Sequence, residues 1–287
     1  NRVRTPRASR SMVLTVIYVV RHGYRSNWTV DPSGLYHSPI RTPTGIPSDP
    51  ALASYGIRQA EQLAAHLQAI DPPVDLIYSS PFYRCVQTLL PFTQQLARQK
   101  GDDAVNVNIE PGLGEFYGKA RFDHPSPASI EMLKEHFRRL CIDAGGPIIV
   151  PSTKGESIPE LHDRIAYCLK HLIRRVDDNH KEAKSLLICT HAASVIAIGR
   201  VLTGRMPEDV GEGEFNAFTC GFSKFTRRNA PVPASRVRAD SAEIWSHERP
   251  EQIPDVRWRN EVGIGGGWTC ETNGDCSFLE NGAERGW

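Results

Sequence analysis

The sequence predicts an α/β fold in which a mostly parallel sheet is sandwiched between helices. Short apolar, β-branched segments alternate along the chain with longer segments whose apolar residues recur at helical spacing. Gly and Pro concentrate between these segments or near the two ends of the chain. The predicted strands are Thr15–Val20, Asp75–Ser80, Val105–Glu110, Ser185–Thr190 and Asn216–Phe225.

The predicted helices fall between these strands and cover both faces of the sheet. They are Tyr55–Ile70, Phe82–Lys100, Ser129–Leu140, Ile158–Asp178 and Ala193–Leu202. Pro91 should kink the second helix or divide it in two, because proline lacks the amide that the helix needs. Ser157 and Glu160 have the spacing of a capping box at the start of the fourth helix.

Three segments are expected along the 287 residues. Residues 1–11 are basic and read as a tag or a disordered extension, and residues 12–226 hold the α/β domain. Residues 227–287 contain four of the five tryptophans and predict an irregular extension that packs on the domain or on a partner. Residues 26–53 are rich in proline and form a long loop, which in a compact domain is usually functional or disordered.

Bulk composition excludes several functional classes. The net charge of +1 gives no field that favours nucleic acid or a membrane surface, and no apolar run has the length of a transmembrane helix. The seven cysteines are scattered through apolar patterns, as expected for free thiols in an intracellular protein. Cys270 and Cys276 lack a second Cys or His pair nearby, so neither a metal nor a cofactor is expected.

The first predicted strand leads directly into Arg21-His22-Gly23-Tyr24-Arg25. In open α/β sheets, ligands bind at the carboxyl ends of the strands. Imidazole is a nitrogen nucleophile that is largely neutral at physiological pH, and guanidinium groups match phosphate oxygens. A structural turn residue is the alternative for His22 taken alone.

Three further strand ends supply complementary groups. Arg84 begins a helix after the second strand, Glu115 follows a Gly-rich turn after the third, and His191 follows the fourth. Each has an ordinary structural explanation by itself, such as a surface ion pair or a solvated loop carboxylate. Together they form a nucleophile, guanidinium clamps, a second imidazole and an acid. Phosphate near Glu115 should raise the pKa of its carboxyl, as a general acid requires.

Several segments in a fixed order resemble the histidine phosphatase superfamily, which has the phosphoglycerate mutase-like fold. These segments are Val20-Arg21-His22-Gly23, residues 52–60, Tyr78 through Thr88, Gly155-Glu156-Ser157 and Thr190-His191-Ala192. The resemblance implies that His22 becomes phosphohistidine, that Arg21, Arg84 and His191 bind the phosphoryl group, and that Glu115 donates a proton.

Tyr24 and Arg25 separate the chain from the mutases, which have Glu directly after the glycine. An Arg three residues after His22 is similar to the Sts-type protein tyrosine phosphatases. The string from Arg21 to Trp28 resembles still more closely the phosphatase-like subunit of the fungal transcription factor TFIIIC. That resemblance implies a nuclear protein whose partners are TFIIIC subunits. If the protein is instead like the other relatives, we expect it in the cytoplasm. A homodimer is a further hypothesis.

We therefore expect a metal-independent phosphomonoester hydrolase that acts through His22. Aromatic residues flank the site, so the sequence favours an aryl phosphate such as phosphotyrosine, bound by Arg25, Tyr24, Trp28, Tyr83 and Phe116. Packing of these rings against the sheet is the alternative. Two other functions stay open: a scaffold subunit of an RNA polymerase III transcription factor with little or no catalysis, and a sugar-phosphate phosphatase or mutase.

Overall fold

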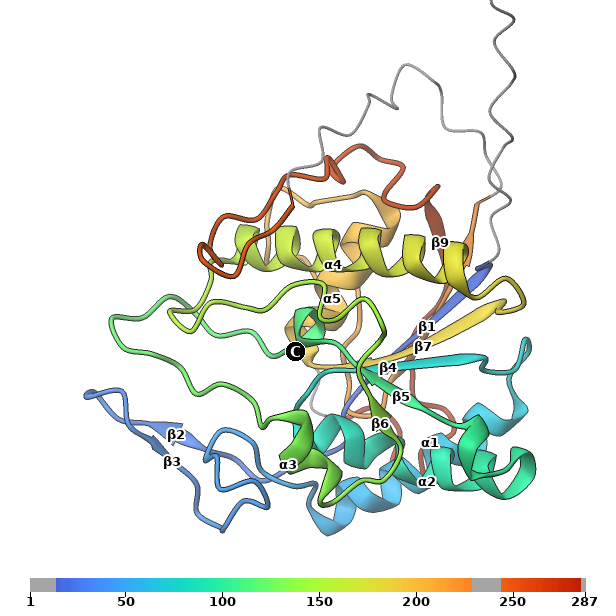
Figure 1. Cartoon of the computed structure of the whole chain (residues 1–287), viewed down its shortest axis with the longest axis horizontal. Coiled ribbons are helices and arrows are strands. Elements are labelled where there is room, and N and C mark those ends of the chain that lie inside the picture. The colour runs from blue at the N-terminus through green and yellow to red at the C-terminus, as the bar shows by residue number, and fades with distance from the viewer. Residues whose placement is uncertain (1–13, 229–243, 285–287) are drawn as a thin grey trace, which may run out of the picture.

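The computed structural model of the chain describes residues 14–228 and 244–284 and shows a seven-stranded sheet between two layers of helices (Figure 1). The strand order is β6-β5-β4-β7-β1-β8-β9. The first five of these are mutually parallel, and β8 runs antiparallel to both of its neighbours. The predicted fold class is thus confirmed. The strands are β1 (Val16–Arg21), β4 (Leu76–Ser79), β5 (Val107–Ile109), β6 (Leu140–Cys141), β7 (Ser185–Thr190), β8 (Phe222–Arg227) and β9 (Trp268–Asp275).

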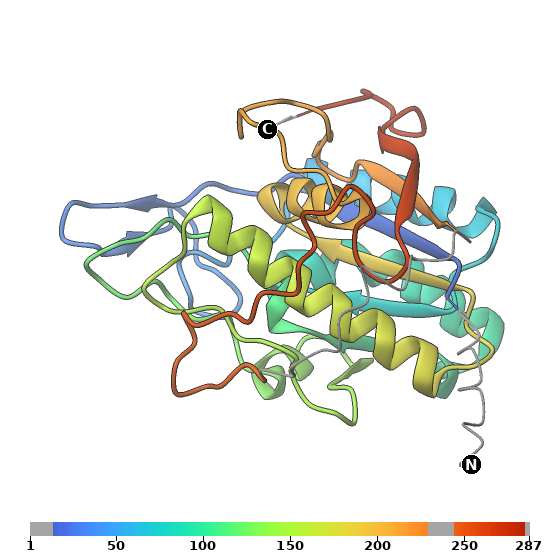
Figure 2. The ribbon, with the colours of Figure 1, turned by 90° about the horizontal axis from the view of Figure 1, so that it is seen from above.

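Helices cover both faces of the sheet (Figures 1 and 2). Helices α1 (Ser54–Ala69) and α2 (Tyr83–Lys100) lie on one face, and α4 (Ile158–Asn179) and α5 (Ala192–Thr203) lie on the other. Successive side chains of the buried strands point to opposite faces, so Tyr18 packs in the α1/α2 core whereas Ile17 packs in the α4/α5 core. Both layers of apolar packing therefore hold β1 and β7 in the centre of the sheet.

The register of the central strands brings their carboxyl ends together. Val20 is paired with Cys189 of β7, and Ser79 of β4 is paired with the same residue on its other side. The ladder continues past the strand ends: the amide of His22 donates to the Thr190 carbonyl, and that of Ser80 donates to the Cys189 carbonyl, each at 3.0 Å. Segments far apart in the sequence thus meet at one edge of the sheet.

Two of the predicted helices differ from those observed. Of the two outcomes expected at Pro91, a kink or a division, the division is wrong, because helix α2 is continuous from Tyr83 to Lys100. Buried residues on both sides of the proline, such as Leu89 and Phe92, pack into the α1/α2 core and hold the helix together. Helix α3 (Ile130–Lys134) is much shorter than predicted, because the following residues turn to place Leu140 and Cys141 beside β5 as the edge strand β6.

Several short elements lie in the connections. The long loop after β1 contains a two-stranded hairpin formed by β2 (Thr29–Val30) and β3 (Tyr36–His37). Two 3₁₀ helices, Asp102–Ala104 and Pro111–Leu113, precede and follow β5. Helix α4 begins with the predicted capping box, in which the Ser157 hydroxyl accepts from the Glu160 amide and the Glu160 carboxylate accepts from the Ser157 amide. No helix of the described segments is long and apolar enough to cross a lipid bilayer.

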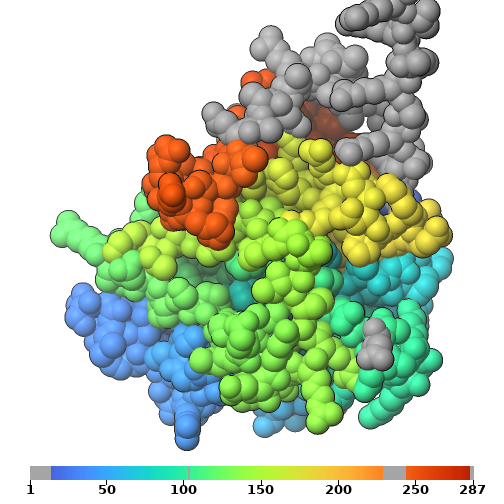
Figure 3. Space-filling view, in the orientation of Figure 1, coloured from blue at the N-terminus to red at the C-terminus, as the bar shows by residue number. Residues whose placement is uncertain are grey.

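The C-terminal segment was expected to be irregular, and this expectation is wrong for Trp268–Asp275. These residues form β9, which pairs with β8 and completes the sheet. Trp258 and Trp268 are fully buried in the α4/α5 core, and Trp245 is nearly so. Residues 244–267 follow α4 without a helix or strand, as the orange-red trace in Figure 2 shows, and they form the orange surface in Figure 3. Residues 1–11, for which a tag or a disordered extension was expected, lie outside the described residues.

Candidate active site

His22 lies directly after β1 and is almost fully buried. Its Nδ1 lies 2.8 Å from the carbonyl oxygen of Gly23. A carbonyl can only accept, so Nδ1 carries the proton of the neutral ring and Nε2 has the lone pair. Burial lowers the pKa of His22 well below its usual range, and the nearby charges of Arg84 and His191 lower it further. The ring is therefore neutral at physiological pH, with its lone pair on Nε2.

Helices α1 and α2 fix the turn that follows His22. The Gly23 amide donates to the Thr88 hydroxyl at 3.0 Å, and the Tyr24 amide donates to the Gln59 side-chain oxygen at 2.9 Å. Gly56 is required here, because a Cβ atom at this position would lie 2.0 Å from the Tyr24 carbonyl oxygen. The start of α1 therefore packs directly against the turn that follows His22.

Arg84 lies in the first turn of α2 and is fully buried. Its Nη2 donates to Glu115 Oε2 at 2.9 Å, and its Nη1 donates to the Ser48 carbonyl at 3.0 Å. Nη1 also lies 3.3 Å from Asp49 Oδ1. A buried guanidinium held in this way has the fixed geometry and charge that suit an anionic oxygen ligand.

Glu115 follows β5 in a turn that several buried groups hold in place. Inside the turn, the Glu110 carboxylate accepts from the amides of Gly112 and Ile148 at 2.8 and 2.9 Å. From α4, the buried Arg164 donates to the Gly112 carbonyl at 2.7 Å. The turn needs glycine at position 112, because a Cβ there would lie only 2.6 Å from a methyl group of Ile149. These contacts aim Glu115 at Arg84.

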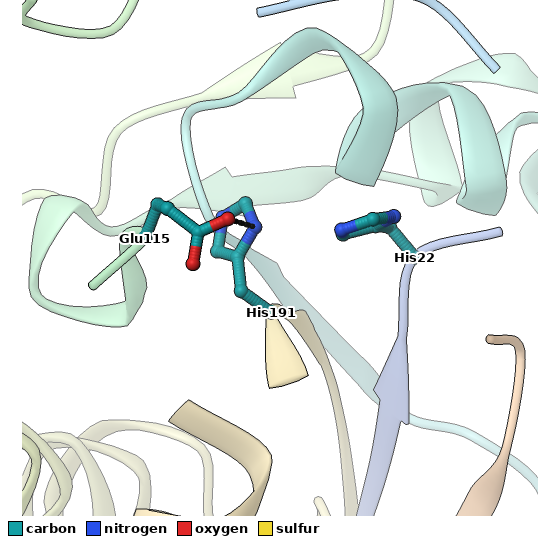
Figure 4. A group of neighbouring side chains, drawn as sticks. All are labelled: His22, Glu115 and His191. Carbon is teal, nitrogen blue, oxygen red and sulfur yellow. Dashed lines mark ion pairs between the residues drawn. The ribbon is translucent and has the colours of Figure 1, made fainter. Parts of the chain in front are cut away.

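His191 lies between the other two titratable groups of the site, as Figure 4 shows. Its Nδ1 lies 3.2 Å from Glu115 Oε2, and its Nε2 lies 2.7 Å from the Ser80 hydroxyl. The ring centroids of His191 and His22 are 5.3 Å apart. Burial lowers the pKa of His191, but Cys85 and the Glu115 carboxylate oppose it, and the net direction is upward. A protonated His191 would present a second cation beside Arg84.

The expected rise in the pKa of Glu115 beside phosphate stays a prediction, and the protein groups around this carboxyl act in the other direction. Burial raises the pKa of this carboxyl, but the charges of His191 and Arg84 outweigh burial and hold the pKa well below its usual range. Glu115 is thus an ionised partner of these two groups. A phosphoryl dianion that binds His191 and Arg84 in place of Glu115 would no longer let them stabilise the ionised carboxylate. The pKa of Glu115 would then rise.

His22, Glu115 and His191 each offer one ligand atom, and these atoms lie within 4.8 Å of one another. Such a trio has the donor set of a transition-metal site. Arg84, however, places its guanidinium against both Glu115 and His191 and would repel a cation there. The surrounding charge therefore favours an anion.

The other predicted site residues are two arginines and four aromatic residues. Arg21 and Arg25 are close enough for their charges to lower the pKa of His22, and Arg25 also lies over the Trp28 ring at 5.7 Å. The predicted aromatic residues pack against neighbouring rings or the core. Tyr24 contacts Tyr55, Trp28 contacts Tyr36 and Tyr117, Tyr83 contacts His136 and Phe137, and Phe116 packs against the α4/α5 core.

Four buried polar groups of the site were missed by the sequence analysis: Asp49, Glu110, Glu156 and Arg164. Asp49 contacts Arg84, and the Glu156 carboxylate accepts from Arg164 at 2.9 Å. The proline-rich loop and the segment Gly155-Glu156-Ser157 were the available signals, but neither indicates which partner such a residue reaches.

A profile of the histidine phosphatase superfamily (branch 1) matches residues 17–231. The chain belongs to this superfamily. The match covers all the strand ends that carry the site residues, and it confirms the superfamily that the sequence motifs indicated.

Two curated relatives also agree with the resemblances drawn from the sequence. The chain is 31% identical to the transcription factor tau 55 kDa subunit of Saccharomyces cerevisiae, over 96% of this chain and 59% of the yeast protein. It is 26% identical to the human ubiquitin-associated and SH3 domain-containing protein A, over 68% of this chain and 32% of that protein. The chain thus spans less than two thirds of either relative.

The fold also matches a solved phosphatase structure. The ecdysone phosphate phosphatase of Bombix mori, in complex with tungstate, superposes with a TM-score of 0.54 over 74% of this chain and 88% of the phosphatase. The sequence identity of this pair is 19%, so the comparison supports the fold.

Proposed function

We propose that this protein hydrolyses phosphomonoesters through a phosphohistidine on His22. The main support is the spatial arrangement of His22, Arg84, Glu115 and His191, in which a buried neutral imidazole faces a guanidinium, a second imidazole and a carboxyl group. The reaction needs no metal, because Arg84, His191, Arg21 and Arg25 can offset the charge of the transferred group.

In the first step, His22 Nε2 attacks phosphorus in line. The N–P bond forms while the bond from phosphorus to the leaving oxygen breaks, and protonated Glu115 gives its proton to that oxygen. Glu115 becomes protonated once the bound phosphoryl group replaces it as the partner of Arg84 and His191.

In the second step, the Glu115 carboxylate takes a proton from water. The water oxygen attacks phosphorus, the N–P bond breaks, and inorganic phosphate leaves with His22 neutral again. Both steps use the same carboxyl group in opposite protonation states, so they form a closed cycle.

Replacing His22 tests the proposal. We expect His22→Ala to abolish phosphate release from 4-nitrophenyl phosphate, while His180→Ala, at the far end of α4, retains it. Rapid quenching of the wild type should trap an acid-labile phosphoryl group that the alanine variant lacks. Full turnover by His22→Ala would refute the scheme.

We further propose aryl phosphates, such as phosphotyrosine, as substrates. Tyr24, Trp28 and Tyr117 form aromatic contacts beside the site, and aromatic faces suit an aryl leaving group. A comparison of kcat/KM for phosphotyrosine peptides and for sugar phosphates tests this. Equal or faster turnover of the sugar phosphates would favour the sugar-phosphate alternative instead.

A scaffold role in a nuclear transcription factor is the second candidate. It is supported by the yeast tau 55 kDa subunit, whose similarity extends through 96% of this chain and so includes the tryptophan-rich segment. We expect the protein to co-purify with TFIIIC subunits of its source organism, and His22→Ala to do so equally well. Loss of assembly in His22→Ala would instead link catalysis to the complex.

Size-exclusion chromatography with light scattering tests the homodimer hypothesis.

A further inference from the structure

A mainly apolar cavity of about 270 Å³ lies beside Glu115. Its walls include Phe82, Tyr117, Ile142, Val150 and several prolines, and Glu115 itself lines it. Proline fixes its own backbone, so much of this wall is preorganised. The cavity is therefore formed before any ligand binds.

Phe82 is a wall that the cavity shares with the phosphoryl site. The Phe82 ring centroid lies 4.9 Å from that of His191, and the Arg84 guanidinium lies over the same ring at 4.6 Å. A molecule that reaches from Arg84 into the cavity would therefore pass along Phe82 and Glu115.

In-line attack determines which part of a substrate enters the cavity. The leaving oxygen must lie on the side of phosphorus opposite to His22, and Glu115 lies across His191 from His22 in Figure 4. Ligand atoms of His22 and Glu115 are within 4.8 Å of each other, and a reacting nitrogen and phosphorus start about 3 Å apart. Glu115 can thus reach the leaving oxygen, and the rest of the leaving group continues into the cavity.

Several polar side chains of the cavity wall already have partners within the protein. Both ring nitrogens of His124 are used, at 2.5 Å from the Tyr36 hydroxyl and 2.7 Å from the Gly118 carbonyl. The Thr153 hydroxyl donates to Asp123, and the Ser129 hydroxyl accepts from the Met132 amide. These groups offer little to the hydroxyls of a sugar, whose burial without partners would weaken binding.

The size of the cavity indicates how large an apolar group it takes. A cavity of roughly 150 Å³ in another protein holds one benzene molecule. The present cavity is nearly twice that size, so a single ring would leave part of it unfilled.

We propose that this cavity is the leaving-group subsite and that it selects two-ring aryl phosphomonoesters over single-ring ones. The proposal rests on the hydrolysis proposed above, in which the aryl oxygen departs with the proton of Glu115 as a neutral arenol.

Binding of two phosphonates tests the subsite independently of turnover. Benzylphosphonate and 1-naphthylmethylphosphonate have a CH₂ group in place of the ester oxygen, so neither can be hydrolysed. We expect calorimetry to show that the wild type binds the naphthyl compound about tenfold more tightly.

Matched substitutions test whether the preference for the naphthyl phosphonate arises in the cavity. Ile142→Trp and Val150→Phe fill the cavity and should bring the affinity ratio towards one. Ile158→Trp and Val210→Phe are comparable changes at exposed positions outside it and should retain the ratio. Equal wild-type affinities would overturn the subsite proposal, as would an unchanged ratio in both folded filling variants.

Measurements of turnover distinguish a failure of the subsite proposal from a failure of the proposed hydrolysis. We expect wild-type kcat/KM to be about tenfold higher for 1-naphthyl phosphate than for phenyl phosphate. Turnover of both esters with equal phosphonate affinities would refute the subsite alone. Preferential binding of the naphthyl phosphonate without phosphate release from either ester would refute the hydrolysis.

Discussion

Arg84 Nη1 lies 3.3 Å from Asp49 Oδ1, and both side chains are completely buried. Asp49 Oδ2 also accepts from the Tyr83 amide at 3.1 Å, so the carboxylate joins the long loop after β1 to the first turn of α2. Asp49 thus contacts Nη1 of the guanidinium, while Glu115 contacts Nη2. The loop is part of the site architecture rather than a cover over it.

Substitution of Asp49 should impair both activity and stability. Asp49→Ala removes one partner of a buried ion pair, which typically costs about 3–5 kcal/mol of unfolding free energy. We expect phosphate affinity to fall as well, since Arg84 loses its orientation, whereas Asp49→Asn retains an acceptor for Tyr83 and should be milder. Urea unfolding and phosphate titration measure the two effects.

The exposed Asp123–Lys154 pair provides the control for this substitution. Asp123→Ala should leave the unfolding free energy almost unchanged, because solvated ion pairs contribute little. Equal effects of the two alanine substitutions would contradict a positioning role for Asp49.

Replacement of Glu115 should affect poor leaving groups most. Glu115→Gln cannot donate a proton, and loss of general acid catalysis typically slows a reaction by about 10²–10⁴-fold. We expect a loss of this size in kcat/KM for phenyl phosphate and a smaller one for 4-nitrophenyl phosphate, whose leaving oxygen needs less protonation. Identical losses for both esters would argue against an acid role.

The pH dependence of stability should report the buried His22. Burial and nearby cations lower its folded-state pKa well below 6.5, so below pH 6.5 the unfolded chain binds a proton that the folded protein does not. Stability from this group is therefore present above pH 6.5 and lost as the pH falls, by up to about 1.4 kcal/mol per pH unit. Urea unfolding from pH 7.5 to 5 should show the loss.

His22→Asn removes the titrating group and is the reference for that measurement. The wild-type curve minus the variant curve isolates His22 from the buried carboxyls. This matters because burial raises the pKa of Glu110 to about 7, which gives a slope of opposite sign. If the difference in unfolding free energy between the wild type and His22→Asn does not depend on pH, a neutral buried His22 is contradicted.

The C-terminal strand should be essential for the stability of the domain. Trp268 begins β9, is fully buried, and lies under the Arg227 guanidinium at 5.4 Å. Trp268→Ala should lower the unfolding free energy by about 3–5 kcal/mol. Ile244→Ala changes a residue that is 81% exposed and should alter it by about 0.5 kcal/mol or less. Urea unfolding compares the two, and a small effect at Trp268 would mean that β9 contributes little.

Local patterns predicted the parts of the fold in which sequence and packing agree. β7 is an apolar segment buried on both faces, and α4 combines a capping box with helical periodicity. The pattern failed where a distant partner decides the structure. β9 has a polar sequence and forms because it pairs with β8, and β6 takes the last residue of a predicted helix because it pairs with β5.

The sequence by itself determined the sheet class, the superfamily and the four strand-end residues His22, Arg84, Glu115 and His191. It could do so because their types and spacing are local properties of the chain. Only the tertiary structure decided their charge states and the residues that hold their side chains in place. Glu115 is ionised because Arg84 and His191 contact it, and Arg84 is held by Asp49 from a loop without regular pattern. Electrostatic energies depend on distance and burial, which follow from the packing of the whole chain.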